Sequence, residues 1–306
     1  MIVVLTGGTG GAKLIEGLAA EVDPAELTII CNTGDDCVLH GLHISPDIDT
    51  IMYTLTGLID DARGWGIKGD TFTTLEQLGR LGADTWFKLG DRDLATHMWR
   101  TGLLSERVRL SQVTAHICRT LGIKTAILPM SDERVETRLR TADREISFQE
   151  YFVKERWQPM VRKVYYAGAV KSKPAPGVLN ALGSASAIII CPSNPVTSIG
   201  PILAVPGIRN ALKKTSATVV GVSPIIGASA ISGPAHKLMK ATGWEASALA
   251  VARAYADFLD VFVFANEDKS LKAEIEELNV RAVATEIRME NLAGKRRLAR
   301  EVLALI

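Results

Sequence analysis

The amino-acid sequence predicts one α/β domain of the Rossmann-like class, a three-layer doubly wound fold with a mostly parallel sheet and a helical insertion after the second strand. Short apolar segments rich in valine and isoleucine alternate with segments of helical pattern, which is typical of such sheets. The first apolar segment, residues 2–5, is followed closely by four glycines. A chain of 306 residues can form one large domain or two modest ones. We expect a single domain over residues 1–306, with residues 40–104 as a substrate-binding insertion within it.

The composition excludes several classes of partner. Hydrophobic residues make up 47% of the chain and charged residues 23%, as in ordinary soluble enzymes. The formal net charge of +1 creates no field that attracts a polyanion, so we expect no nucleic-acid partner. Because no apolar segment reaches the roughly 18 residues of a membrane span, and the N-terminus lacks a basic leader region, we expect no membrane partner and no signal peptide. The four cysteines form no C-x-x-C pair, which indicates reduced thiols and a cytoplasmic protein.

The segment IVVLTGGTGGAK, residues 2–13, is the strongest local signal. Glycine has no Cβ, so the backbone can turn sharply there and approach a ligand closely. A strand, this turn and a helix from about Ala12 to Ala20 would direct several backbone N–H groups, and the positive end of the helix dipole, at one point. The alternative is a merely tight strand–helix turn, which needs fewer glycines. We expect a phosphate-binding site at this turn, which contains Gly7, Gly8, Gly10 and Gly11.

The spacing of these glycines differs from two common nucleotide-binding motifs. A dinucleotide fingerprint G-x-G-x-x-G that begins at Gly8 would require glycine at position 13, where Lys13 stands. A Walker A loop would need glycine before that lysine and serine or threonine after it, but its neighbours are Ala12 and Leu14. The spacing therefore supports neither an ordinary NAD site nor a P-loop ATPase. Lys13 either reaches a phosphate or is a solvated lysine of the first helical turn.

Polar side chains follow the second predicted strand, residues 28–32. In doubly wound folds the end of this strand lies beside the first loop, and ligands bind outside the carboxyl ends of the strands. Asn32 offers a donor and an acceptor, while Asp35 and Asp36 could contact a ribose or a metal ion. The alternative is an acidic turn, because Gly-Asp is common in turns.

Residues 40–104 combine aromatic rings with many carboxylates. Three of the five tryptophans lie there: Trp65, Trp86 and Trp99. Such a mixture suits a flat, ring-bearing ligand with polyol or metal-bound groups. The alternative is a helical insertion with acidic caps, and we favour it for four residues: Asp60, Asp61, Asp70 and Asp84. Asp47 also precedes a plausible helix. Asp49 differs because it lies among apolar residues at the start of that helix, and residues 88–93, KLGDRD, look like a loop with convergent charges.

The remaining chain continues the pattern with one excursion. A helix is expected at 105–121 and a strand at 125–130, whereas 134–142 and 161–169 look extended around a short helix near 148–156. Pro176 suits the first turn of a helix over 176–182. Further strands are expected at 187–191, 218–222, 260–264 and 280–284. Further helices are expected at 208–214, 235–242, 246–258, 270–278 and 292–305.

The loop at residues 192–201, PSNPVTSIGP, follows a central-looking strand and should lie at the same sheet edge as the glycines. Its hydroxyl groups and backbone amides would suit a second phosphate group or the shell of a metal ion. A structural cluster of turns is the alternative, although the loop is longer than the two to six residues that such a connection requires.

Six segments in this order resemble the 2-phospho-L-lactate transferases of deazaflavin-coenzyme biosynthesis: GGTGGAKL, NTGDD, SPDIDTI, WFKLGDRD, CPSNPVTSIGPIL and SPIIG. The resemblance runs over nearly the whole chain. It implies a Rossmann-like fold, magnesium as cofactor and a homodimer. The implied reaction transfers a phospho-lactyl group, or a phospho-enolpyruvyl group in bacterial relatives, from a guanosine diphosphate ester to the ribityl hydroxyl of a deazariboflavin, and GMP leaves.

The resemblance also implies roles for individual residues. The deazariboflavin-binding positions fall on Asp49 and Lys88, and Asp49 is the expected catalytic residue and magnesium ligand. For Asp49, a general base and a magnesium ligand are the two alternative roles. The nucleotide-binding positions fall on Gly8, Thr9, Gly10, Gly11, Asn32, Asp35, Asp36, Ser193 and Asn194.

Two other functions are considered beside the transferase. A sugar-nucleotide-binding regulatory protein of the same superfamily would share the glycines but would not need the SPDID and FKLGDRD segments. A nicotinamide oxidoreductase is disfavoured by Lys13 and by the lack of an acidic residue that ends the second strand.

Overall fold

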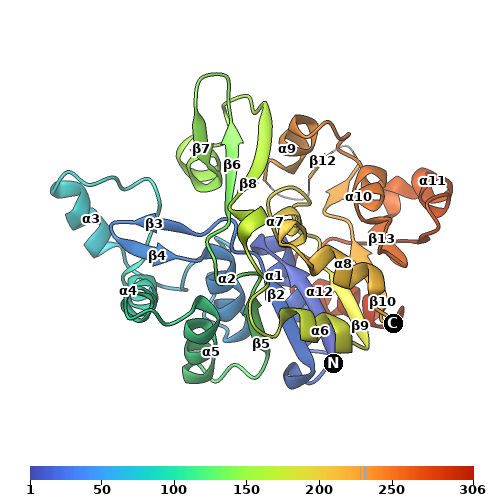
Figure 1. The fold of residues 1–306 in the computed structure, drawn as a ribbon, viewed down its shortest axis with the longest axis horizontal. Coiled ribbons are helices and arrows are strands. Elements are labelled where there is room, and N and C mark those ends of the chain that lie inside the picture. The colour runs from blue at the N-terminus through green and yellow to red at the C-terminus, as the bar shows by residue number, and fades with distance from the viewer. Residues whose placement is uncertain (228, 231–232) are drawn as a thin grey trace.

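The computed structural model describes residues 1–227, 229–230 and 233–306. In this part of the chain seven strands form one sheet in which every neighbouring pair is parallel (Figure 1). In spatial order they are β14 (Arg281–Thr285), β13 (Val261–Ala265), β10 (Thr218–Val222), β9 (Ala187–Ile190), β1 (Ile2–Thr6), β2 (Leu27–Cys31) and β5 (Ala126–Pro129). The predicted α/β class and parallel sheet are confirmed.

The strand order reverses direction between β1 and β9. From β1 the chain proceeds to β2 and β5 on one side, and from β9 to β10, β13 and β14 on the other. Ile2 is in register with Leu27 of β2 and with Ala187 of β9, so the carboxyl ends of the three strands lie at one edge. In open α/β sheets the crevice at such a reversal is where ligands bind.

Alternating strand residues supply two separate hydrophobic cores. Val3 and Leu5 pack into one core, whereas Val4 packs into the other, because successive side chains of a strand point to opposite faces. The helices whose side chains join the core of Val4 are α1 (Gly8–Ala19), α2 (Pro46–Leu55), α5 (Leu110–Thr120) and α12 (Leu292–Leu303). The core of Val3 includes side chains of α6 (Val178–Ser184), α7 (Ile199–Ala204), α8 (Ile208–Lys214), α9 (Ala235–Ala241), α10 (Ala248–Tyr255) and α11 (Lys272–Glu276). The sheet and the two sets of helices on its opposite faces are the three layers that the sequence predicts.

The segment between β2 and α5 begins with a small antiparallel hairpin rather than with a helix. Its strands are β3 (Cys37–Leu39) and β4 (Leu42–Ile44). The helices α2, α3 (Thr73–Arg80) and α4 (Asp91–Ser105) follow, and an isolated bridge between Ile59 and Ile67 closes the loop after α2. Figure 1 shows β3, β4 and α3 extending away from the central sheet.

A second, antiparallel sheet of β7, β6 and β8 projects from the carboxyl edge in Figure 1. Its strands are β6 (Glu136–Arg140), β7 (Glu145–Ser147) and β8 (Lys163–Ala167). The expected short helix near 148–156 is the π-helical turn η2 (Glu150–Lys154) between β7 and β8. The predicted excursion is therefore present, as a three-stranded sheet.

Several predicted boundaries are shifted. The first helix begins at Gly8, not Ala12, so three of the glycines are part of its first turn. The helix expected from Pro176 begins at Val178, because Gly177 at its N-cap has a left-handed φ of 93° and Pro176 precedes that turn. The helix expected at 270–278 is divided into the 3₁₀ turn η4 (Asn266–Leu271) and α11.

Smaller elements complete the described chain: the 3₁₀ turns η1 (Pro24–Glu26) and η3 (Ala169–Lys171), and the short hairpin strands β11 (Ile225–Ile226) and β12 (Ser229–Ala230). Among the residues that the structure describes, none of the helices has both the length and the apolar character needed to span a bilayer.

Candidate functional site

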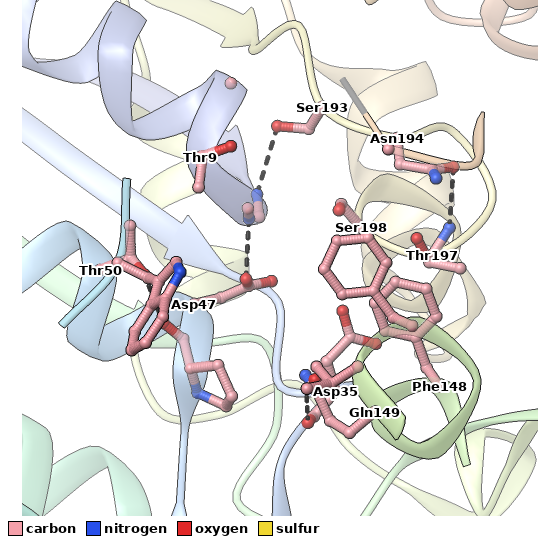
Figure 2. Close-up of a pocket in the computed structure, with 18 of the residues that line it drawn as sticks. Thr9, Asp35, Asp47, Thr50, Phe148, Gln149, Ser193, Asn194, Thr197 and Ser198 are labelled. Atoms are coloured by element: carbon pink, nitrogen blue, oxygen red, sulfur yellow. Dashed lines mark hydrogen bonds between the residues drawn. The ribbon is translucent and has the colours of Figure 1, made fainter. Parts of the chain in front are cut away.

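A cavity of about 540 Å³ opens at the crevice between β1 and β9. Its walls come from the first turn of α1, the turn after β2, the segment 44–97, the loop after β9 and the segment 148–157. Of the site residues expected from the sequence, those that line it are Gly8, Thr9, Gly10, Asp35, Asp49, Lys88, Ser193 and Asn194. Segments far apart in the sequence thus meet in one pocket (Figure 2).

The first turn of α1 presents backbone N–H groups to this pocket. The first N–H groups of a helix have no partner within the helix, and they carry the positive end of its dipole. The N–H of Gly8 donates to Asp47 Oδ1 at 2.8 Å, and the N–H of Gly7 donates to Ser193 Oγ at 3.4 Å (Figure 2). Gly10 is required by space, because a Cβ there would lie 2.5 Å from the carbonyl oxygen of Pro192. The geometry is that of an anion-binding helix terminus.

Asp47 also lines the pocket, although its place in the sequence indicated only a residue that precedes a helix. It lies in the first turn of α2, buried at 7% exposure, and its Oδ2 accepts a hydrogen bond of 2.9 Å from Asn32 Nδ2. Asn32 also donates to the carbonyl of Thr197 at 3.2 Å and accepts from the N–H of Gly34. Asn32 therefore connects the ends of β2 and β9 from behind the pocket. The pairing of two acidic residues in SPDID was the signal that could have indicated Asp47.

Three buried carboxylates lie near each other behind the glycines. Burial raises the pKa of Asp35 well above its usual range, and the charges of Asp47 and Asp36 raise it further. Burial likewise raises the pKa of Asp36, despite hydrogen bonds to its Oδ2 from His43 at 3.0 Å and Ser45 at 2.7 Å. For Asp47 burial raises the pKa to about 6. Within the part of the chain that the structure describes, one carboxylate oxygen each of Asp35 and Asp36 is buried without a hydrogen-bond partner.

This carboxylate group could contribute to a magnesium site. A cation would favour the ionised forms and would be an electrostatic partner for the unpaired oxygen of Asp35. Within the described ranges no three His, Cys, Asp or Glu side chains are arranged to hold a metal ion by themselves. Magnesium commonly takes only one or two carboxylates and completes its shell with phosphate oxygens and water, so this arrangement fits it.

Asp49 lies in the pocket wall in an ion pair. Arg100 Nη1 donates to Asp49 Oδ2 at 3.0 Å and its Nη2 contacts Asp49 Oδ1, and both side chains are almost fully buried. His97, at 1% exposure, lies between two carboxylates: its Nδ1 is 3.6 Å from Asp49 and its Nε2 is 3.3 Å from Asp93. Tyr53 OH also donates to Asp93, at 2.7 Å. Helices α2 and α4 are thus joined by one polar network at the pocket.

Lys88 lies near the same wall, is exposed, and lines the pocket together with Phe87 and Trp65. The loop that the sequence suggested as a set of convergent charges has a partly structural role, because Asp91 accepts hydrogen bonds from Thr71 Oγ1 and from the N–H groups of Thr73 and Thr74. Trp99 does not contribute to the pocket among the described residues; it is 55% exposed on α4.

Two of the acidic residues expected as helix caps accept backbone hydrogen bonds, but neither caps the helix that follows it, α3, whose N-cap residue is Phe72. Asp60 accepts from the N–H groups of Ala62 and Arg63, and Asp70 accepts from that of Arg92.

The loop after β9 supplies hydroxyl groups at the pocket. Ser193, Thr197 and Ser198 are buried, and all three line it. Asn194 Oδ1 accepts from the N–H of Val196 at 2.9 Å and of Thr197 at 3.3 Å, so its side chain shapes the loop (Figure 2). Asn32 and Asp36 are not among the lining residues in the described chain. Asn32 donates to the lining residue Asp47, whereas Asp36 contacts His43 and Ser45, which do not line this pocket.

One wall was not expected as part of the site. Residues 148–157, interpreted from the sequence as a peripheral short helix, contribute Phe148, Gln149, Phe152 and Trp157 to the pocket. Their role in the pocket was not predictable because they lie far in sequence from every motif. Only the fold of the β7–β6–β8 sheet brings them to the carboxyl edge.

The chain is similar to known proteins over its whole length. The family model described as 2-phospho-L-lactate transferase CofD matches residues 2–303. A 2-phospho-L-lactate transferase of Methanothermobacter thermautotrophicus is 44% identical over 306 residues, which covers 100% of this chain and 98% of that protein. A phosphoenolpyruvate transferase of Streptomyces griseus is 44% identical over 310 residues, 99% of this chain and 98% of that protein. A crystal structure of a upf0052 family member from Bacillus halodurans superposes with a TM-score of 0.66 at 17% identity, covering 99% of this chain and 98% of that one.

Proposed function

This chain belongs to the 2-phospho-L-lactate transferase family, and from that premise we propose how its pocket carries out the transfer. It is a transferase of coenzyme F(420) biosynthesis. The 2-phospho-L-lactate moiety passes from lactyl-2-diphospho-5'-guanosine to the ribityl hydroxyl of 7,8-didemethyl-8-hydroxy-5-deazariboflavin, and GMP is released. A sugar-nucleotide-binding regulatory protein is not favoured, because relatives that match the whole chain at 44% identity are named as transferases.

The observation that carries the mechanism is the continuity of one pocket between an anion-binding helix terminus and the residues Asp49 and Lys88. Phosphoryl transfer depends mainly on positioning and on neutralising charge. The first turn of α1 and Ser193 would bind the diphosphate of the donor. Asp49 and Lys88 would bind the deazariboflavin and direct its hydroxyl at the phosphorus. The donor diphosphate and the acceptor hydroxyl would then be within one cavity of about 540 Å³.

In the proposed step the ribityl oxygen forms a bond to the phosphorus that bears lactate, and the bond from that phosphorus to the bridging oxygen of GMP breaks. The electron pair of the broken bond leaves with GMP. The hydroxyl proton passes to Asp49, which acts as general base. Arg100 holds the Asp49 carboxylate through both oxygens, and it fixes where that carboxylate points.

We propose magnesium as the cofactor, held by Asp35 and Asp47 together with phosphate oxygens and water. Bound there, the metal would neutralise charge on the diphosphate. Asp49 was the metal ligand expected from the sequence, and that role stays a prediction; both of its oxygens contact Arg100, whereas Asp35 has an unpaired buried oxygen.

We also propose a homodimer in the cytoplasm. The family resemblance supports the dimer, and the four free cysteines of the described chain support a reducing compartment. Light scattering after size exclusion should give twice the chain mass of 33.0 kDa. A mass of one chain would contradict the dimer.

The test of the function is direct. The purified protein is incubated with deazariboflavin, Mg²⁺ and either the lactyl or the enolpyruvyl diphosphoguanosine donor, and GMP is measured. We propose the lactyl ester as the preferred donor; the enolpyruvyl ester is the matched alternative, since relatives of both names are 44% identical to this chain. Release of GMP that requires the deazariboflavin supports the transferase. No release with either donor would overturn it.

A further inference from the structure

Three aromatic side chains form a wall of the pocket that the proposed mechanism does not use. Phe148, Phe152 and Trp157 all line the cavity. The rings of Phe148 and Phe152 are stacked, with centroids 5.4 Å apart and 16° between their planes, and the ring of Trp157 lies 5.5 Å beyond Phe152 at 34°. The series provides a continuous apolar surface of the kind on which a flat heteroaromatic ring packs.

The backbone that presents this wall is unusual. The turn η2 is π-helical, and the next residues include Arg156 and Trp157 with φ values of 48° and 47°. Two consecutive residues other than glycine in the left-handed region are strained, and such strain and π-helical turns are concentrated at functional sites. The N–H of Trp157 donates to the Tyr151 carbonyl at 2.8 Å, and its own carbonyl accepts from Lys237 Nζ at 3.0 Å. The surrounding structure therefore holds Trp157 in place.

The wall lies on one defined side of the pocket. Figure 2 shows Phe148 on the same side of the pocket as Thr197, and Gln149 beside Asp35, with Thr50 of α2 on the opposite side. Gln149 Nε2 donates to the carbonyl of Asp35 at 3.3 Å, which ties the wall to the turn after β2. The wall is thus next to the loop after β9, and it faces the helix that carries Asp49.

We infer that Phe148, Phe152 and Trp157 form the subsite for the guanine base of the nucleotide donor. The inference rests on the proposed function, which brings two flat ring systems into one pocket. The acceptor is proposed at Asp49 and Lys88, and Trp65 lines the pocket with Lys88, so the wall near the β9 loop remains for the base whose diphosphate is bound at Ser193.

Two variants, Trp157→Leu and Phe152→Leu, test this subsite. Stacking of a base on an aromatic side chain predicts that the KM for the guanosine donor rises about fivefold to a hundredfold, while the KM for deazariboflavin is unchanged. Trp157→Tyr should restore much of the donor affinity. Trp99→Leu is the matched control, because Trp99 is 55% exposed on α4 and outside the pocket, and it should leave both constants unchanged. A rise in the deazariboflavin KM instead, or no change in either constant, would overturn the assignment.

A binding readout separates this subsite from the reaction. GDP added without acceptor should quench the fluorescence of the wild-type protein, and the quench should be largely lost in Trp157→Leu but retained in Trp99→Leu. If the protein releases no GMP from either donor and GDP still quenches Trp157, the subsite stands and the proposed reaction fails. If GMP is released normally and both wall variants keep the donor KM, the reaction stands and the subsite fails.

Discussion

Arg100 and Asp49 form a bidentate ion pair whose side chains are 1% and 6% exposed, with 3.0 Å between Nη1 and Oδ2. The pair joins α4 to α2 directly at the pocket wall. Burial and the charge of Asp49 act in opposite directions on the pKa of Arg100, and the result is a raised pKa, so the guanidinium stays charged. The carboxylate on which the proposed chemistry depends is therefore fixed by a charge that cannot be removed by titration.

Asp49→Asn should lose both activity and stability. Loss of a general base costs roughly 10²- to 10⁴-fold in turnover. Leaving Arg100 unpaired in the interior costs about 3–5 kcal/mol of unfolding free energy. GMP release and urea denaturation, both at low temperature, measure the two effects.

The double variant Asp49→Asn with Arg100→Met separates these effects. Removing the unpaired charge should recover much of the stability, whereas turnover should remain low because no base is present. A double variant that regained both stability and turnover would show that Asp49 has only a structural role.

Gly10→Ala should weaken donor binding. The added Cβ would lie 2.5 Å from the backbone oxygen of Pro192, so the first turn of α1 must move away from the loop after β9. Such overpacking costs about 1–3 kcal/mol, and the donor KM should rise while the acceptor KM changes little. Gly102→Ala in α4 is the matched control, because no other group of the described residues lies within 4 Å of its added Cβ. That substitution should stabilise the protein by about 0.5–1 kcal/mol. Equal donor KM values for both variants would contradict the role of the first turn.

The fold was predictable because each strand carries its own signal. Val3 and Leu5 face one core and Val4 the other, so the strand had to be apolar at every position, and this is visible in the sequence. The boundaries were less predictable. Glycine has low helix propensity, which placed the expected start of α1 at Ala12, but tertiary packing around the loop after β9 begins the helix at Gly8.

Strand order alone made the candidate site predictable only where residues follow a strand directly, whereas Asp49 and Lys88 were expected from the family resemblance. Asp35 and Ser193 reach the pocket for that reason. The partners of Asp49 were not, because Arg100 is 51 residues away in the chain and only the packing of α4 on α2 brings the two together. Trp157 depends on the same kind of long-range contact, because the segment between β7 and β8 that carries it reaches the pocket only through the fold of the β7–β6–β8 sheet.

Lys88→Met should raise the KM for deazariboflavin. Lys88 is exposed and lines the pocket, so its ammonium group is available to a ligand, and a hydrogen bond to a charged group contributes about 1.5–3 kcal/mol. The KM should therefore rise roughly tenfold to a hundredfold, and Lys88→Arg should recover part of it. Lys214→Met, at an exposed lysine in the last turn of α8, should have no effect. A rise confined to the donor KM would place Lys88 with the nucleotide instead.

Asp35→Asn should raise the Mg²⁺ concentration needed for half-maximal activity by roughly tenfold or more, because it removes a carboxylate with an unpaired buried oxygen. Chelation with EDTA should abolish GMP release, and added Mg²⁺ should restore it. Asp143→Asn, at an exposed residue, is the control and should keep the wild-type Mg²⁺ requirement. Activity that persists in EDTA would contradict the magnesium proposal.

Asp47→Ser should change the pH dependence of stability in metal-free buffer. Burial raises the pKa of Asp47 from 3.8 to about 6. A group whose pKa is raised on folding contributes its full stabilisation only below the unfolded pKa, and this is lost as the pH rises through about 6. Ionised Asp47 therefore destabilises the wild-type protein at pH 8, whereas the serine variant has no such charge.

The serine variant loses the hydrogen bonds from Gly8 and Asn32 at every pH. The part of its stability difference from wild type that changes with pH therefore comes from the charge of Asp47. Between pH 4.5 and 8 the unfolding free energy of Asp47→Ser should improve relative to wild type by on the order of 2 kcal/mol, measured by urea denaturation. Asp143→Ser should show no such change, because Asp143 is exposed. If the difference in unfolding free energy between Asp47→Ser and wild type is the same at both pH values, Asp47 carries no buried charge. The electrostatic reason for proposing Asp47 as a metal ligand would then be lost.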